Sequence, residues 1–207
     1  KWPVLTRPYV AGFTRPVTGM SFDSTGAQRG WFYDGTNPIE SIGVLSGYAK
    51  SMAYGMNNND IVVGYSSKTG DTQGIYWTKA GGMVGLGYLD DTQLYSNAIE
   101  INNLGQIVGK ARINLGTAEY PIIEDHAVIW NNGVIKDLND YVDPSSGWVL
   151  EQATMIDDNG TIVGYGFKDD VMHGFMMTLP PVPEPSTLVL LATGLLGLLA
   201  YAWRRLK

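Results

Sequence analysis

His126 and His173 are the only two histidines of the chain, and histidine is the side chain best suited to act as a general base or metal ligand near neutral pH. Each stands just before a short apolar run, at a position that Gln73 and Arg29 occupy in two similar segments. A position that accepts His, Gln and Arg requires a polar side chain rather than a base or a ligand. We therefore expect both histidines to be structural.

Neighbouring carboxylates are the second set of residues that could do chemistry. They occur at Asp90-Asp91, Glu124-Asp125, Asp157-Asp158 and Asp169-Asp170. A glycosidase needs two carboxylates about 5 to 9.5 Å apart across a cleft, and adjacency in sequence does not establish this arrangement. Solvated loop charge accounts for most of these pairs, while calcium binding in the Asn- and Asp-rich turns stays open. With no phosphate-binding glycine loop, Gly-x-Ser-x-Gly elbow or His-Glu-x-x-His motif, the sequence predicts no catalytic residue, metal or cofactor.

Composition indicates an all-β protein and excludes several kinds of partner. The 207 residues include 26 Gly, 12 Tyr and 6 Trp, and only 16% are charged. The absence of cysteine excludes disulfides and thiolate metal sites. Net charge is −6, and without the three cations of the last four residues the remainder carries −9. Such an acidic body excludes nucleic acid as an expected partner.

Three segments align without gaps, at residues 53–64, 98–109 and 153–164. They start 45 and 55 residues apart, and we place the excess of the second interval in a surface insertion at 112–124. Residues 17–21 resemble 62–66, 45 positions later, so the first repeat is expected to be truncated. A period near 45 residues is typical of a supersecondary unit that buries its faces only against its neighbours.

The unit that starts at Ala53 predicts four short strands, at 53–56, 61–66, 74–78 and 83–86. Asn102 and Asp157 precede Gly105 and Gly160 by three residues, which favours a type I turn between the first two strands. The segment 127–130 is apolar throughout, so both its faces should be covered. The expected fold is an all-β array of four-stranded units, similar to the blades of a β-propeller.

This pattern resembles the bacterial extracellular HAF repeat. The likeness rests on His126-Ala127-Val128 and on the segment 101–109, which reads Ile-Asn-Asn-Leu-Gly-Gln-Ile-Val-Gly. The resemblance covers about residues 17–179 and implies export and repetition, but no reaction. Aromatic side chains could stack on sugars or pack in the core, and Trp148, in the loop-like stretch 143–149, is the one that departs from the repeat.

The last 28 residues, 180–207, have a different character. Prolines at 180, 181, 183 and 185 hold residues 180–186 extended and remove amide donors. The uncharged apolar run 187–203 would reach about 25 Å as a helix, close to the roughly 30 Å of a bilayer core. Arg204, Arg205 and Lys207 follow it, and such cations stay on the cytoplasmic side. We predict a membrane-spanning helix with the body of the protein, residues 1–179, outside.

This tail resembles the PEP-CTERM sorting signal of Gram-negative bacteria that make extracellular polysaccharide. Pro183, Glu184 and Pro185, the apolar run and the basic stub occur in the order of that signal. The resemblance implies recognition by an exosortase in the inner membrane, cleavage near the motif, and release to the cell surface or matrix. The alternative is a Pro-rich spacer before a permanent anchor.

These observations lead to one hypothesis and one alternative. The chain is expected to be a non-enzymatic, exported envelope or matrix protein with a binding or structural role and extracellular polysaccharide as a candidate partner. The alternative is a polysaccharide-acting enzyme on a β-propeller. An enzyme would need polar residues that converge at one place and break the repeat.

Overall fold

The computed structural model describes residues 16–179, so the predicted linker, helix and basic stub at 180–207 lie outside the described part. The described residues form four antiparallel sheets, each an up-and-down meander, with only two short 3-10 helices. The first sheet is β1 (Val17–Phe22), β2 (Gln28–Tyr33) and β3 (Glu40–Gly43); the second is β4 (Lys50–Met56), β5 (Val62–Lys68), β6 (Asp71–Thr78) and β7 (Gly82–Gly85); the third is β8 (Ser96–Ile101), β9 (Ile107–Asn114), β10 (Ile123–Asn131) and β11 (Val134–Asp137); the fourth is β12 (Trp148–Ile156), β13 (Thr161–Lys168) and β14 (Val171–Thr178). The helices η1 (Leu138–Tyr141) and η2 (Pro144–Ser146) join the last two sheets.

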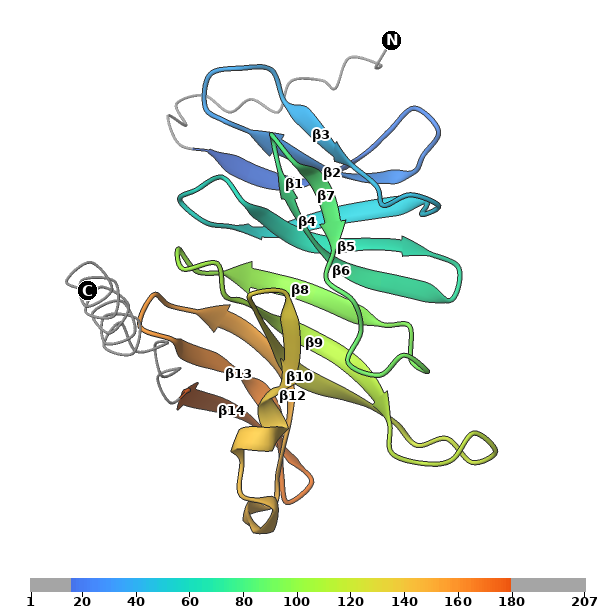
Figure 1. Ribbon diagram of the computed structural model, residues 1–207, viewed down its shortest axis with the longest axis vertical. Coiled ribbons are helices and arrows are strands. Elements are labelled where there is room, and N and C mark those ends of the chain that lie inside the picture. The colour runs from blue at the N-terminus through green and yellow to red at the C-terminus, as the bar shows by residue number, and fades with distance from the viewer. Residues whose placement is uncertain (1–15, 180–207) are drawn as a thin grey trace, which may run out of the picture.

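The sheets stack in chain order, with the first and the fourth at opposite ends of the array (Figure 1). The all-β prediction is confirmed, and the four strands expected from Ala53 onward match β4 to β7 within a few residues. Within residues 16–179 the stack is open and closes into neither a ring nor a barrel. The expected insertion at 112–124 is in part strand, because β9 runs to Asn114 and β10 begins at Ile123, which leaves 115–122 as the loop of a long hairpin.

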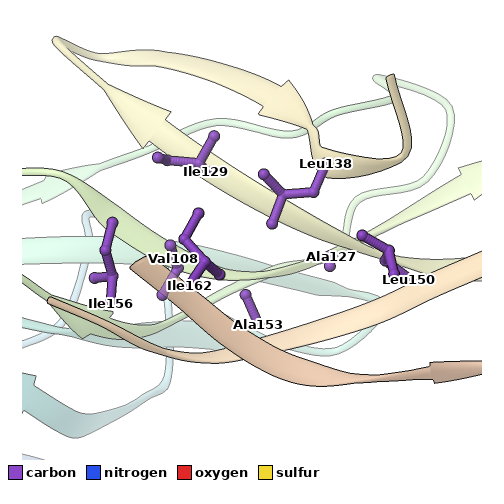
Figure 2. Packing of buried hydrophobic residues seen from close by; sticks show 8 residues of the cluster. All are labelled: Val108, Ala127, Ile129, Leu138, Leu150, Ala153, Ile156 and Ile162. Carbon is purple, nitrogen blue, oxygen red and sulfur yellow. The ribbon is translucent and has the colours of Figure 1, made fainter. Parts of the chain in front are cut away.

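Each pair of consecutive sheets shares one apolar cluster. Phe32 and Ile42 of the first sheet pack against Val62, Ile75 and Trp77 of the second. The second and third sheets meet through a cluster that includes Val63, Val128 and Trp130. The third and fourth meet through a cluster in which side chains of β9, β10, β12 and β13 converge (Figure 2). The core is therefore divided into three layers, one between each pair of neighbouring sheets.

The apolar strand segments contribute side chains to the clusters on both faces of their sheet. Val128 and Trp130 pack toward the second sheet, whereas Ala127 and Ile129 pack toward the fourth, and all four are almost fully buried. Successive residues of a strand point to opposite faces, so a run without polar residues is what a strand covered on both sides requires. This explains why residues 127–130 show no alternation of polar and apolar side chains. It confirms the prediction that both faces of this segment are covered.

A β-bulge recurs in the first strand of three sheets. The pairing register shifts between Ala53 and Gly55, between Ala98 and Glu100, and between Ala153 and Met155. Opposite each bulge stands the glycine of the aligned segments, and a Cβ on Gly109 would overlap the backbone carbonyl oxygen of Asn97. Glycine is needed there because the bulge brings the partner backbone too close for any side chain.

The Asn- and Asp-rich turns join neighbouring sheets by hydrogen bonds. Asn57 and Asn102 each hold their own turn, through side-chain oxygens that accept backbone N–H groups two and four residues later. The Asn57 side-chain amide also donates to the backbone carbonyl of Asn102 at 3.0 Å. The turn bond from Gly105 N to Asn102 O confirms the predicted turn, and Asp60 adopts the same left-handed conformation as Gly105. Asn102 in turn donates to Asp157 O, so the turns of the second, third and fourth sheets form one polar row.

Buried serine hydroxyls make a second polar link that the sequence did not reveal. Ser51 accepts a hydrogen bond from Gly30 N and donates to Gly43 O, both in the preceding sheet. Ser96, 45 residues later, accepts from Gly74 N in the preceding sheet and donates to Gly87 O, which follows β7. These bonds satisfy backbone groups that the sheet ladders leave free.

Candidate functional site

His126 lies inside strand β10 rather than before it, and its side chain is buried. Its Nδ1 is 2.6 Å from Asp137 Oδ2, and its Nε2, which has no hydrogen-bond partner, is 3.6 Å from Glu124 Oε2. In the second sheet the corresponding pair is Gln73 and Gly85, where the Gln73 amide occupies the space above the glycine. This geometry fits a structural role for His126. It differs from Gln73 in that its partner is the carboxylate of Asp137 instead of a glycine.

The environment of His126 favours its protonated form. Burial is the largest influence and lowers the pKa, but the hydrogen bond to Asp137 and the charges of Asp137 and Glu124 outweigh it, so the pKa is raised above its ordinary value of 6.5. A histidine whose protonated form is favoured by two carboxylates is less suited to act as a general base.

His173 and Trp148 lie together in the fourth sheet. Their ring centroids are 6.0 Å apart at an angle of 65°. His173 is exposed in β14, whereas Trp148 is the first residue of β12 and packs against the cluster of the third and fourth sheets. The prediction that Trp148 stands in a loop is wrong, because only 144–146 of that stretch form a helical turn and the strand starts immediately afterwards.

Several members of the carboxylate pairs stabilise turns and strands through hydrogen bonds and ion pairs. Asp90 accepts hydrogen bonds from Thr92 and from Asn114 N, and Asp157 holds its own turn. Asp169 and Asp170 form the tight turn between β13 and β14, both with positive φ. The interpretation of Asp125 as solvated loop charge is wrong, because it lies within β10 and pairs with Lys110 at 2.6 Å and with Arg112 at 3.1 Å.

Asp71 anchors a polar cluster that the sequence did not reveal. This almost fully buried carboxylate accepts hydrogen bonds from the hydroxyls of Tyr48 and Tyr88, and Lys68 Nζ lies 3.2 Å from it. Burial, the largest influence, raises the pKa of Asp71, but the donors from Tyr88, Tyr48 and Lys68 together lower it. Because the four residues join segments before β4, around β6 and after β7, only the folded chain brings them together.

A second convergence, here named the Tyr–Lys cluster, combines aromatic and charged side chains of the second and third sheets. Its members are Tyr54, Tyr65, Tyr95, Lys110, Arg112 and Asp125. The rings of Tyr54 and Tyr65 are 5.9 Å apart, and the guanidinium of Arg112 lies 4.2 Å from the ring centre of Tyr95. Lys110 Nζ is 5.6 Å from the same ring. Tyr54 remains 44% exposed, so the cluster reaches the surface.

The pKa values of the cluster reflect this mutual proximity. Burial is the largest influence on Tyr54 and raises its pKa, a hydrogen bond with Asn97 lowers it, and Tyr65 and Tyr95 raise it further. For Lys110, burial lowers the pKa, but Asp125 and the neighbouring Tyr95 raise it more, so the ammonium stays charged. Flat aromatic faces beside charged donors and acceptors are typical of a surface that binds polar, ring-shaped ligands.

The cluster supplies no hydrolytic pair. Asp125 is the only carboxylate among its six members, and it is already bound by two cations. Across residues 16–179, no three His, Asp or Glu side chains lie close enough together to hold a metal ion. The described residues also contain no helix of the length and apolarity that crossing a bilayer requires.

The predicted sorting residues Pro183, Glu184, Pro185, Arg204, Arg205 and Lys207 lie outside the described residues. Comparison of the chain with curated proteins and with solved structures finds no match. Residues 181–205, however, match the family described as the PEP-CTERM protein-sorting motif. This match includes the Pro-Glu-Pro residues and the apolar run, so the chain carries the signal of an exported protein that an exosortase processes.

Proposed function

We propose that this chain is an exported protein of the cell surface or extracellular matrix of a Gram-negative bacterium, in which the sheet array binds extracellular polysaccharide. The observation that carries the proposal is the match of residues 181–205 to the PEP-CTERM protein-sorting motif. In this proposal, Pro183, Glu184 and Pro185 are the residues that the exosortase recognises. Residues 187–203 cross the inner membrane before cleavage, with residues 204–207 in the cytoplasm and the sheets outside.

Mass spectrometry of the protein released at the cell surface tests the sorting half of the proposal. Cleavage near the motif predicts that the peptide 203–207 is missing from the released form. Replacing Pro183, Glu184 and Pro185 by alanine should leave the protein in the membrane fraction, whereas the matched variant with Pro180→Ala and Pro181→Ala should be released normally. Equal release of both variants, or a released protein that retains Lys207, would show that the segment is a spacer before a permanent anchor.

We further propose that the sheets are units of one repeating design, related to the HAF repeat and to propeller blades. In this proposal the chain divides into a repeat domain at 1–179, a Pro-rich linker at 180–186, a membrane-spanning helix at 187–203 and a basic stub at 204–207. Three kinds of contact support this proposal. The bulges recur opposite equivalent glycines, the serine links recur 45 residues apart, and the turn contacts join residues 45 or 55 apart.

The Tyr–Lys cluster supports the binding role. It departs from the repeat, because Tyr54 aligns with Ile99 and Thr154, and Lys110 aligns with two tyrosines, Tyr65 and Tyr165. Its rings can stack on the apolar faces of sugars, while Arg112 and Asp125 can donate to and accept from hydroxyl groups. A polysaccharide is also the ligand that an exported surface protein of this kind meets at its destination.

Affinity electrophoresis through gels that contain the polysaccharide of the producing bacterium tests the binding role. Tyr54→Ala and Tyr95→Ala should each migrate faster than the unmodified protein, because part of the stacking surface is lost. The matched control is Tyr120→Ala, which removes a 72% exposed tyrosine from the 115–122 loop. If all three variants are retarded as strongly as the unmodified protein, the Tyr–Lys cluster is not the binding site.

A further inference from the structure

The fourth sheet exposes an apolar face that the other sheets bury. Phe32 and Ile129 stand two residues after Gly30 and Ala127, on the side that meets the next sheet, and each is only 2% exposed. Met176 stands two residues after Gly174 in the same register, and it is 76% exposed. The position that holds a buried core residue in the first and third sheets thus holds an exposed methionine in the fourth.

Met176 belongs to a row of apolar side chains that crosses the whole sheet. Register places Met155 opposite Val163, and Val163 opposite Met176. The aligned counterparts of Val163 are Val63 and Val108, both fully buried against the following sheet. Met155 is 58% exposed, and Met172, on the Met176 side of β14, is 59% exposed. We name Met155, Val163, Met172 and Met176 the methionine face.

The other end of the stack carries the complementary surface. In the second and third sheets, the residues that pack toward the preceding sheet are Ile75 with Trp77 and Val128 with Trp130, all at most 4% exposed. Their counterparts in the first sheet are Trp31 and Tyr33, which are only partly buried. Register pairs them with Gly19 and Val17, and the Trp31 ring lies over Gly19. We name Trp31 and Tyr33 the aromatic face.

We propose that copies of this chain associate head to tail, with the methionine face of one copy packed on the aromatic face of the next. The argument is continuity with the interfaces inside the chain, since such a contact repeats the one between consecutive sheets. Methionine adapts its shape and makes favourable contacts with aromatic rings. Because the two faces differ and lie at opposite ends of the stack that residues 16–179 form (Figure 1), the contact is heterologous and extends into a row of molecules. This inference goes beyond the proposed export and polysaccharide binding.

Disulfide trapping tests the arrangement directly, because the natural chain contains no cysteine. Met176→Cys and Tyr33→Cys are introduced into separate full-length chains, which are purified in mild detergent, mixed and oxidised. Head-to-tail contact predicts cross-linked dimers in the mixture and few in either variant alone. Dimers of Met176→Cys alone at the same rate would show face-to-face pairing, and no cross-link in any sample would show no association; both results overturn the proposal.

A charge variant gives an independent readout. Met176→Asp places a carboxylate in the contact and should weaken self-association, measured by sedimentation velocity of the full chain, by about tenfold or more. Its unfolding temperature should stay unchanged, because Met176 is exposed in the single molecule. Leu104→Asp, at a 70% exposed leucine of a turn, is the control and should associate normally. Undiminished association of Met176→Asp, or equal weakening in both variants, would contradict the proposal.

Discussion

Asn102 donates a hydrogen bond from its side-chain amide to the backbone carbonyl of Asp157, 55 residues later, at 2.9 Å. The same amide also donates to Gln106 Oε1, while the Asn102 side-chain oxygen accepts from Leu104 N and Gln106 N. One buried side chain therefore holds its own turn and joins the third sheet to the fourth. Asp157 holds the corresponding turn of the fourth sheet through its two carboxylate oxygens, which only accept hydrogen bonds.

Replacing Asn102 by Asp should reduce the free energy of unfolding by about 1 to 3 kcal/mol, because the acceptor oxygen remains but the donor to Asp157 O is lost in a buried place. Asp157→Asn is the matched control in an exposed turn and should change stability little. Urea denaturation of the two variants and the unmodified chain measures both effects. Equal stability of Asn102→Asp and the unmodified chain would show that the bond between the turns contributes nothing.

Gly109→Ala should be strongly destabilising, by about 2 to 4 kcal/mol, because its Cβ would overlap the carbonyl of Asn97 and force the bulge open. Gly174→Ala is the control, because the nearest atom to a Cβ there is Gly164 O at 3.7 Å, an ordinary contact. Thermal unfolding monitored by tryptophan fluorescence distinguishes the two variants. Similar unfolding temperatures would show that the space opposite the bulge is not limiting.

His126 should make stability depend on pH near neutrality. Its pKa is raised in the folded protein, so its contribution is fully present below the ordinary value of 6.5 and is lost as the pH rises through the folded-state pKa. His126→Gln, which introduces the residue found at position 73, should remove this dependence. Denaturation curves measured from pH 5.5 to 8.5 check the prediction, and an unaltered pH slope in the variant would contradict it.

Asp71 should act in the opposite direction and at lower pH. Its pKa lies below the ordinary value of 3.8, so its stabilising contribution is present above that value and is lost as the pH falls through the folded-state pKa. Asp71→Asn leaves Tyr48, Tyr88 and Lys68 without a charged acceptor and should cost about 2 kcal/mol at pH 7. The cost should shrink in acid, and a difference that stays constant down to pH 3 would refute this account.

Periodic patterns in the sequence predicted the strands well, because the residue types that favour strands and turns in β4 to β7 lie close together within residues 53–86. The expected turn at Asn102 was confirmed for the same reason. The position of Trp148 was predicted wrongly, because the Pro144 and Gly147 that suggest a loop form only a short connection before β12.

Residues that meet only in three dimensions left no comparable signal. Asp71 lies 23 residues from Tyr48 and 17 from Tyr88, and no local pattern connects such positions. The Tyr–Lys cluster joins two sheets, and the members that depart from the repeat, such as Tyr54 and Lys110, do so at different positions. A comparison of the aligned units position by position could have revealed Lys110, since it replaces a tyrosine found 45 residues earlier and 55 later.

The division of the core into layers between sheets governs how the chain gains and loses order. No sheet has an interior of its own, so each becomes stable only when its neighbour is in place, and stability passes along the stack from one contact to the next. Within residues 16–179 the first and fourth sheets each have a single neighbouring sheet, so their amide hydrogens should exchange with solvent faster than those of β5 and β9. During synthesis, the most recently folded sheet would expose one apolar face to solvent until the following sheet has formed and covers it.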